Sequence, residues 1–542
     1  MKKITGLLLG LSLCATLPIN TNAQEISDND FNNLFEYSEY NFDDLELYFK
    51  ETQAIVKDFN KDGTDDLLVC GGKSAFGTCE YFMSVFLGQR DGTMKEVTLT
   101  GDPVILEFGS ANPIMDVVET ENNKYLVAIQ GASHTTGASG DWWKDNVMQA
   151  AVYQLTFAGN DEFNLELVQN LEHGGGRGSL QFIDVNGDGF YDLTQYGFIE
   201  FGNGWSEEAC IYINNNNVEF QYNTDSGLPT GANNASNGFM RKADFNKDGK
   251  EDLVILNQRG GGNEALVVYF NKGDGTFEPL TITSNLTCVR DEREHMAMNV
   301  ADVNNDGYPD IIAMCPNEKI PQWAFNVEIW LNDKNGDFTL SEGSKDLMSG
   351  QRDCITLADW NLDGNIDMMY CGWNTKRHAY EASDASRGTK CYLCLGKGDG
   401  SFDDYVLDVN DMKDENDKVV GAPITPVNGS DGTMYAGDFN GDGKPDLIQM
   451  GAINKLYLGK GIPSAINKET KKEIQISLDK NNICIKSESE GIANVYNLTG
   501  QQIYSQSIEA GKCNFNLNAN NGIYIIEVSN KNSKAQQKIA IK

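Results

Sequence analysis

Short apolar runs of strand length recur along the chain and alternate with acidic or glycine-containing turns. Leu67–Val69 and Ile311–Ala313 each follow an acidic segment, and the aromatic-rich run Leu266–Phe270 leads into a turn. Four hairpin dipeptides supply the positive φ angles that tight turns need: Asp91-Gly92, Asp274-Gly275, Asn335-Gly336 and Asp399-Gly400. The pattern predicts an all-β protein with antiparallel strands.

A nine-residue acidic segment, Asp-x-Asn-x-Asp-Gly-x-x-Asp, occurs six times between these strands. The copies begin at Asp58, Asp184, Asp244, Asp302, Asp359 and Asp438. From Asp184 to Asp359 the starts are 60, 58 and 57 residues apart, and a decayed copy around Met115–Ala128 fills the gap before Asp184. Four antiparallel strands every ~60 residues describe a propeller blade. We therefore expect a β-propeller of about seven blades, followed by a small C-terminal β-sandwich.

The last repeat is short, because no fourth strand is evident after Ile453–Leu458. Residues 30–50 precede the first repeat and contain the aromatic segment Phe35–Tyr40. An unpaired sheet edge is a liability. We expect this N-terminal segment to supply the missing strand and close the ring.

The acidic segments predict calcium sites. Calcium takes 6–8 oxygen ligands, which the side chains at positions 1, 3, 5 and 9 and the carbonyl at position 7 can supply once Gly at position 6 turns the backbone. An EF-hand would need Glu at position 12, where the first copy has Val69, and a following helix. Ordinary turn formation is the alternative reading. The predicted ligands are Asp58, Asn60, Asp62, Thr64 and Asp66; Asp184, Asn186, Asp188, Phe190 and Asp192; Asp244, Asn246, Asp248, Lys250 and Asp252; Asp302, Asn304, Asp306, Tyr308 and Asp310; Asp359, Asn361, Asp363, Asn365 and Asp367; and Asp438, Asn440, Asp442, Lys444 and Asp446.

These segments, together with the Asn-Lys-Gly-Asp-Gly-Thr-Phe hairpin at 271–277, resemble the FG-GAP/VCBS repeats of integrin-α-type propellers. The resemblance covers about residues 50–460. It implies a calcium-binding propeller and leaves the ligand open, because such repeats occur in adhesins, lectins and appendages of enzymes.

Residues 1–23 read as a signal peptide, with Lys2 and Lys3, the apolar run Leu7–Leu17 and the small-residue site Thr21-Asn22-Ala23. Its removal changes the formal net charge from −36 to −38, which disfavours nucleic acid as a partner. No other apolar run reaches the roughly 20 residues of a membrane span. Of the 12 cysteines, all but Cys14 remain, and in an oxidising compartment we expect several to pair.

The propeller is predicted over residues 24–461, and a linker with a separate β-domain over 462–542. The segments Tyr496–Gly500, Gly522–Tyr524 and the terminal Lys538–Lys542 resemble the C-terminal sorting domain of the type IX secretion system. That resemblance implies export across the outer membrane by the type IX machinery, to the cell surface or the medium. A carbohydrate-binding module is the alternative, although the segment has no Trp.

Loops that join the second and third strands of a blade lie on the face opposite the acidic segments. Aromatic side chains in such loops stack well on sugar rings. The candidate ligand-binding residues are Trp142, Trp143, Trp205, Trp373 and His378, which could alternatively cap the blades; Trp330 and Trp360 are expected in the core. These residues favour a surface protein that binds a glycan or an extracellular protein. A calcium-dependent polysaccharide lyase is the alternative, and Arg177, Arg241, His295 and Arg352 are candidates for a function in the central channel.

Overall fold

The computed structural model falls into two compact units, Met1–Pro463 and Ser464–Lys542, which are described separately. It describes residues 35–541 except 42–47, 74–79, 103–108, 135–145, 202–203, 216–218, 224–225, 229–238, 257–265, 284–296, 317–324, 335, 345–346, 348–350, 374–388, 408–432, 451–454, 462–473, 480–481, 488, 498–501, 518, 520–521 and 531–533. The predicted signal peptide, residues 1–23, lies outside the described residues.

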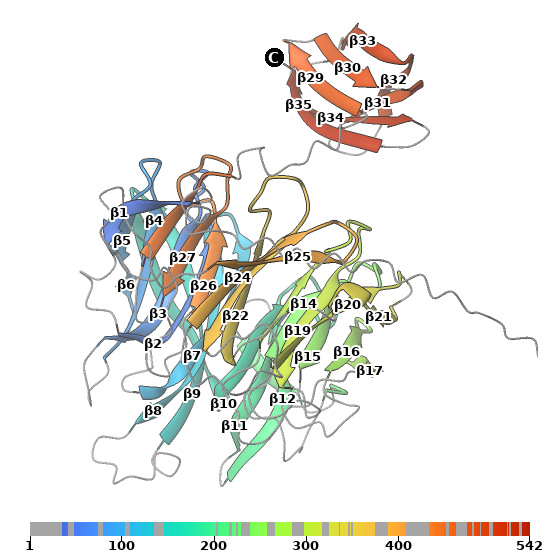
Figure 1. The fold of residues 1–542 in the computed structure, drawn as a ribbon. Coiled ribbons are helices and arrows are strands. Elements are labelled where there is room, and N and C mark those ends of the chain that lie inside the picture. The colour runs from blue at the N-terminus through green and yellow to red at the C-terminus, as the bar shows by residue number, and fades with distance from the viewer. Residues whose placement is uncertain are drawn as a thin grey trace, which may run out of the picture. The chain divides into compact units, whose positions relative to one another are not determined.

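Antiparallel strands make up most of the described part of the first unit (Figure 1), as the alternation of apolar runs and turns predicted. The strands are β1 (Phe35–Asn41), β2 (Tyr48–Lys57), β3 (Asp66–Lys73), β4 (Glu80–Gly88), β5 (Met94–Thr98), β6 (Thr100–Gly101), β7 (Gly109–Glu121), β8 (Lys124–His134), β9 (Asn146–Gly159), β10 (Glu162–Ile183), β11 (Asp192–Phe201), β12 (Gly204–Asn215), β13 (Glu219–Asn223), β14 (Phe239–Ala243), β15 (Asp252–Leu256), β16 (Leu266–Asn271), β17 (Phe277–Ile282), β18 (Ala297–Ala301), β19 (Asp310–Pro316), β20 (Phe325–Asn332), β21 (Phe338–Leu340), β22 (Gln351–Ala358), β23 (Asp367–Trp373), β24 (Thr389–Gly396), β25 (Phe402–Leu407), β26 (Thr433–Gly437), β27 (Asp446–Met450) and β28 (Lys455–Gly459). A 3₁₀ turn, η2 (Glu342–Ser344), follows β21.

Most of these strands form separate four-stranded sheets in chain order: β2–β5, β14–β17, β18–β21 and β22–β25. A larger sheet runs from β7 to β13, with β6 attached to β10. Within it, the first part of β10 pairs with β9, and residues Gly175–Ile183 pair with β11. The long strand β10 therefore serves as the last strand of one set of four and the first strand of the next.

The first strands of successive sheets contact one another in a closed cycle: β2, β7, β10, β14, β18, β22, β26 and back to β2. This cycle places the sheets around a common centre, which is the arrangement of a β-propeller. The all-β propeller fold expected from the sequence is confirmed, and the number of about seven blades stays a prediction.

The N-terminal segment closes the ring. Strand β1 pairs with β28 in the sheet order β1-β28-β27-β26, with Phe35 opposite Gly459 and Tyr37 opposite Tyr457. The Phe35 ring is buried and lies 5.4 Å from the Trp360 ring, centroid to centroid. The predicted contribution of residues 30–50 is confirmed, so the first and last parts of the unit share one sheet.

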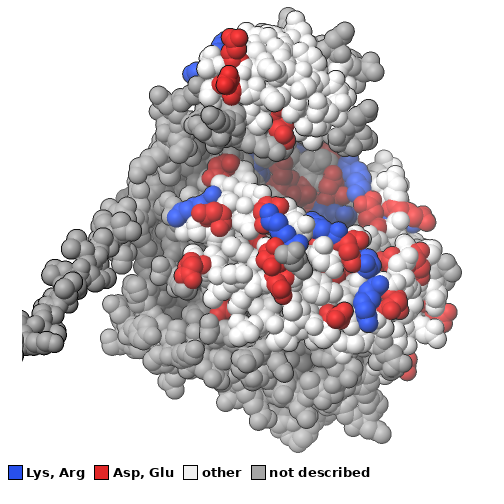
Figure 2. Space-filling model, turned by 90° about the vertical axis from the view of Figure 1, so that its right-hand side faces the viewer, with Lys and Arg blue, Asp and Glu red and all other residues white. Residues whose placement is uncertain are grey.

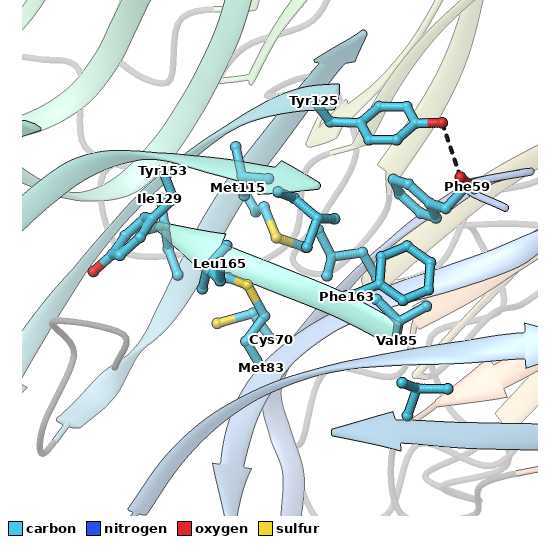
Figure 3. Packing of buried hydrophobic residues seen from close by; sticks show 14 of the residues in the cluster. Phe59, Cys70, Met83, Val85, Met115, Tyr125, Ile129, Tyr153, Phe163 and Leu165 are labelled. Carbon is cyan, nitrogen blue, oxygen red and sulfur yellow. Dashed lines mark hydrogen bonds between the residues drawn. The ribbon is translucent and has the colours of Figure 1, made fainter. Parts of the chain in front are cut away.

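The hydrophobic core lies between neighbouring sheets. One cluster joins Phe59, Cys70 and Val85 of the first repeat to residues of β7–β10 such as Tyr125 and Phe163 (Figure 3). The Tyr125 hydroxyl donates a 3.0 Å hydrogen bond to the Phe59 carbonyl oxygen. Further clusters bridge other consecutive sheets. Each blade therefore depends on its neighbours for burial of its apolar faces.

The second unit is a small sandwich of two antiparallel sheets. One has the order β29-β30-β33 and the other β32-β31-β34-β35, and Ile485, Val495, Phe515 and Ile526 belong to the shared core. The strands are β29 (Ile474–Asp479), β30 (Asn482–Ser487), β31 (Gly491–Asn497), β32 (Gln502–Ile508), β33 (Gly511–Asn516), β34 (Gly522–Asn530) and β35 (Lys534–Ile541). In the described parts of both units, no helix has the length and apolar character needed to cross a membrane.

Candidate metal-binding site

Each acidic segment forms the loop between the first and second strands of a sheet, for example 302–310 between β18 and β19. All six glycines at position 6 have positive φ, from 81° at Gly443 to 90° at Gly249 and Gly307. Position 4 is also left-handed in every loop, even where the residue is Leu362 (φ 58°) or Lys61 (φ 63°). Two left-handed residues wind the backbone tightly, so that the side chains at positions 1, 3 and 5 surround one small region.

Within each loop the polar side chains bind backbone amides. In the fourth copy, Asp302 accepts hydrogen bonds from the amides of Asp306 (3.0 Å) and Gly307 (2.8 Å). The Asn304 amide oxygen also accepts from the Asp306 amide (3.1 Å), and the Asp306 carboxylate accepts from the Tyr308 amide (2.9 Å). The other loops repeat this network, except that Asp184 accepts from the Gly187 amide in place of the Asp188 amide. Hydrogen bonds made within the loop thus hold the oxygen atoms of positions 1, 3 and 5 close together.

Asp at position 9 has a different environment. All six of these residues are fully buried. In each, one carboxylate oxygen accepts from the amide of loop position 2 and the other from the amide of the last residue of the third strand or, for Asn214, of the next-to-last one. For Asp310 these donors are Val303 (2.9 Å) and Asn332 (2.8 Å). The other copies make the same pair of bonds. Position 9 is thus a clamp between the acidic loop and the third strand.

Burial raises the pKa of these six carboxyl groups. The pKa is raised to about 6 for Asp192, Asp252 and Asp310. It is raised to about 7 for Asp66, Asp367 and Asp446. Loss of hydration is the largest cause, the backbone amides oppose it, and the nearby carboxylates of the same loop add to it. A positive charge at the loop would favour the ionised form of these groups.

The loops also connect neighbouring blades. The Asp65 amide donates to the Asp438 carbonyl oxygen (2.8 Å), and the Asp438 amide donates to the Asp65 carboxylate (2.7 Å). The Asn332 side chain donates to the Phe245 carbonyl oxygen of the preceding acidic loop (2.8 Å). The conformation of an acidic loop therefore affects the joint between two sheets as well as its own hairpin.

The donor set suits a hard cation, because each loop offers carboxylate, amide and carbonyl oxygens and no sulfur or imidazole. Among the described residues, no three His, Cys, Asp or Glu side chains converge as a metal centre. The reason is that both carboxylate oxygens of position 9 bind backbone amides. Each loop then has two carboxylates and one side-chain amide oxygen that can face an ion. In two loops a lysine at position 7 contacts the carboxylate at position 5, Lys250 with Asp248 (2.5 Å) and Lys444 with Asp442 (2.7 Å). On the face that Figure 2 shows, Lys and Arg side chains lie between Asp and Glu side chains.

The decayed copy has no acidic loop. Strands β7 and β8 are joined by a short turn in which Asn123 has a φ of 65°. At this joint Lys61 forms a 2.8 Å ion pair with Glu119 and lies over the Tyr125 ring.

Of the predicted ligand-binding residues, Trp205 and Trp373 lie at strand ends, next to connections between second and third strands. Trp373 is the last residue of β23 and Trp205 the second residue of β12. Trp142, Trp143 and His378 lie outside the described residues. Because the acidic loops join first to second strands, Trp205 and Trp373 are at the opposite ends of their blades. Trp330 and Trp360 are buried, as predicted.

The residues at the ends of the third strands were missed in the sequence. They are Gly88, Asn214, Asn271, Asn332, Gly396 and Gly459. Each donates its amide to the position 9 carboxylate. Asn332 also donates its side chain to the Pro309 carbonyl oxygen (3.2 Å), and a Cβ at Gly396 would lie 2.1 Å from the Ile366 carbonyl oxygen. The signal was the recurrence of Asn or Gly directly after an apolar third strand.

The fold and the loops define a repeat β-propeller followed by a separate small β-sandwich, and known family models match a segment of each. Residues 244–313 match the model of the FG-GAP-like repeat, and residues 470–542 match that of the secretion system C-terminal sorting domain. The chain thus carries an FG-GAP-like propeller and a type IX sorting domain, which marks it for the cell surface or for secretion.

A curated relative, the T-cell immunomodulatory protein homolog of Plasmodium yoelii yoelii, is 24% identical over 212 residues; these are 35% of this chain and 29% of the relative. Solved structures with some likeness include the intramolecular trans-sialidase of Ruminococcus gnavus, with 11% identity, a TM-score of 0.34, and 72% of this chain and 98% of that one covered. PorZ, a surface component of the type IX secretion system of Porphyromonas gingivalis, has 10% identity and a TM-score of 0.26, with 89% and 69% covered. The GH43 protein BlXynB of Bacillus licheniformis has 10% identity and a TM-score of 0.29, with 92% and 88% covered.

Proposed function

We propose that the first unit is a calcium-stabilised binding module that an exported protein presents to a glycan or an extracellular protein. The observation that carries this proposal is the difference between the two ends of the blades. One end holds six loops of nearly identical geometry that connect neighbouring sheets. The other end holds the strand ends with Trp205 and Trp373, next to connections whose sequences differ from blade to blade.

Calcium at the first end is supported by the chemistry of the loops. Positions 1, 3 and 5 supply side-chain oxygens, and position 7 would supply its carbonyl. The amide network keeps these oxygens close together before any ion arrives, which lowers the ordering cost of binding. A bound ion would supply positive charge next to the buried carboxylate of position 9, whose pKa is raised by burial. Because the loops also hydrogen-bond to neighbouring blades, such an ion would stabilise the ring.

Ligand binding at the second end is supported by position and residue type. Trp205 and Trp373 lie at strand ends next to variable connections, and the predicted Trp142, Trp143 and His378 belong to two of these connections in the sequence. A tryptophan offers a broad apolar face with one hydrogen-bond donor, which suits a sugar ring or a protein side chain.

The test has two parts. Metal analysis of the purified protein, and its melting temperature with calcium or with excess chelator, should show bound calcium and a marked loss of stability on chelation. No change in melting temperature, in protein shown beforehand to contain calcium, would refute the calcium proposal.

Glycan-array binding at saturating calcium should then fall for Trp143→Ala and Trp373→Ala. Asp188→Ala, at the other end of the blades, is the matched control and should bind as the parent protein does. Equal binding by all three variants, with equal folding, would show that the tryptophans are structural caps. Ultraviolet-absorbing unsaturated uronides released from a bound polysaccharide would indicate a lyase instead.

A further inference from the structure

Three cysteines occupy directly opposed positions across neighbouring strands of one blade. In the pairing of β22 with β23, Cys354 lies opposite Cys371. In the pairing of β23 with β24, the same Cys371 lies opposite Cys391. Directly opposed residues of an antiparallel sheet lie on the same face. The backbone register therefore places the three cysteines in one row on one face of the sheet.

The spacing of this row allows one disulfide at a time. A residue in an antiparallel sheet forms a hydrogen-bonded pair on one side and a non-hydrogen-bonded pair on the other, with Cα separations of about 5.5 and 4.5 Å. Both separations lie in the range of about 4.4–6.8 Å in which disulfides form. The outer two cysteines are two strand spacings apart, roughly 9–10 Å, which is too far for a disulfide. Cys371 can thus bond to either neighbour, but the neighbours cannot bond to each other.

We propose that Cys354, Cys371 and Cys391 form a redox site in which Cys371 shares one disulfide between two partners. Formation of the disulfide consumes two thiols of the row and an external disulfide, which is reduced to two thiols. The thiolate of the third cysteine then attacks the Cys371 sulfur. A new S–S bond forms and the former partner leaves as a thiolate, which takes up the proton that the attacking thiol released when it ionised. The exchange needs no further oxidant, because the number of disulfides is unchanged.

A disulfide fits the observations better than a metal ion bound by all three thiolates. Zinc–sulfur bonds of about 2.3 Å would require the outer sulfurs to approach within about 4–5 Å of each other. Residues two strands apart cannot meet that requirement without distortion of the sheet. The sorting domain also directs the chain out of the cytoplasm. Disulfides persist in the oxidising compartments outside it.

The row stands between the two ends of its blade. The Cys354–Cys371 bond would close a chain segment that contains the whole Asp359–Asp367 loop. The Cys371–Cys391 bond would instead close the segment that leaves β23 at Trp373, two residues beyond Cys371. Exchange would therefore transfer a covalent constraint from the acidic loop to the connection that follows Trp373.

Disulfide mapping of the full-length exported protein tests the proposal. The protein is held at pH 8 without reductant, quenched in acid, alkylated under denaturing conditions and digested for mass spectrometry. Both the Cys354–Cys371 and the Cys371–Cys391 peptides should be found, with the third cysteine alkylated in each. Cys354→Ser and Cys391→Ser should each convert the mixture to the single remaining pair, and Cys371→Ser should leave both outer cysteines alkylated.

Cys394→Ser is the matched control. Cys394 lies on the same strand as Cys391, is fully buried and is opposite Met368, so its loss should leave both pairings present. A reduced Cys371, or a Cys371 bonded to a cysteine outside the row, would overturn the proposal. Recovery of one pairing alone in the parent protein would overturn the exchange step. Cys354→Ser and Cys391→Ser keep the test decisive if Cys371→Ser fails to fold.

Discussion

Replacement of Asp310 by Asn separates the clamp role of position 9 from metal binding. The Asp310 carboxylate is fully buried, and its two oxygens accept from the Val303 amide (2.9 Å) and the Asn332 amide (2.8 Å). Asn has nearly the same shape, but only one of its two terminal atoms is an acceptor. In Asp310→Asn one backbone N–H must therefore face an NH₂ group at a fully buried position.

The expected cost follows from these two bonds. A hydrogen bond to a charged group contributes about 1.5–3 kcal/mol, and a buried donor left unpaired costs about 1–3 kcal/mol. Relief of the buried charge offsets part of this loss, because burial already raises the pKa of Asp310 to about 6. We expect a net destabilisation of about 2–4 kcal/mol, which would lower the melting temperature on the order of 5 °C.

The matched control is Asp306→Asn in the same loop. The Asp306 side chain is 18% exposed, and the acceptor kept by Asn can still bind the Tyr308 amide. In excess chelator Asp306→Asn should cost less than about 1 kcal/mol, and Asp310→Asn should show its full effect. In saturating calcium both variants should be less stable than the parent protein. Equal melting temperatures for the two variants in chelator would refute the clamp role of position 9.

Three further predictions concern other parts of the molecule. Phe35→Ala should cost about 3–5 kcal/mol, because the buried ring anchors the closing strand, whereas Glu36→Ala on the exposed side should change the melting temperature little. Burial raises the pKa of Asp116 to about 6, so its protonated form stabilises the folded protein fully below pH 4, and this stabilisation is lost as pH rises through 6. Asp116→Asn should therefore reduce the loss of folding free energy between pH 4 and 7 by roughly 2–3 kcal/mol, as measured by melting curves in chelator. A chain ending at Gly461 should fold as a propeller and accumulate in the periplasm of its host, and normal arrival at the surface would contradict the sorting role.

The fold was predictable because each repeat contains its own sequence pattern. The period of the acidic segments, the apolar strands beside them and the hairpin dipeptides all occur within one repeat, so each copy supports the others. Ring closure was predictable for a different reason. The last repeat lacked a strand, and an aromatic segment around Phe35 had no other place in the pattern.

The site was predictable only in part, because its remaining contacts join residues distant in sequence. The spacing of the acidic residues located the loops and the turn at position 6. The left-handed conformation of Leu362 could not be predicted from neighbouring residues, because it depends on the fixed ends of the loop. The second bond of Asp310 goes to Asn332, which is 22 residues away. The cysteine row depends on the register of two hairpins with long connections, which no spacing in the sequence specifies.

The decayed repeat, which has no acidic loop, shows how a joint between blades is made where no ion is expected. Where β7 and β8 meet in a short turn, an ion pair and a hydrogen bond connect this turn to the first acidic loop. Lys61 places its ammonium 2.8 Å from the Glu119 carboxylate, and the Tyr125 hydroxyl binds the Phe59 carbonyl oxygen at 3.0 Å. A positive charge and a fixed loop carbonyl thus occur together at this joint. At other joints the described lysines contact one carboxylate of a loop, as at Asp248, Asp306 and Asp442, and the negative charge that this leaves in each loop is the physical reason to expect calcium there.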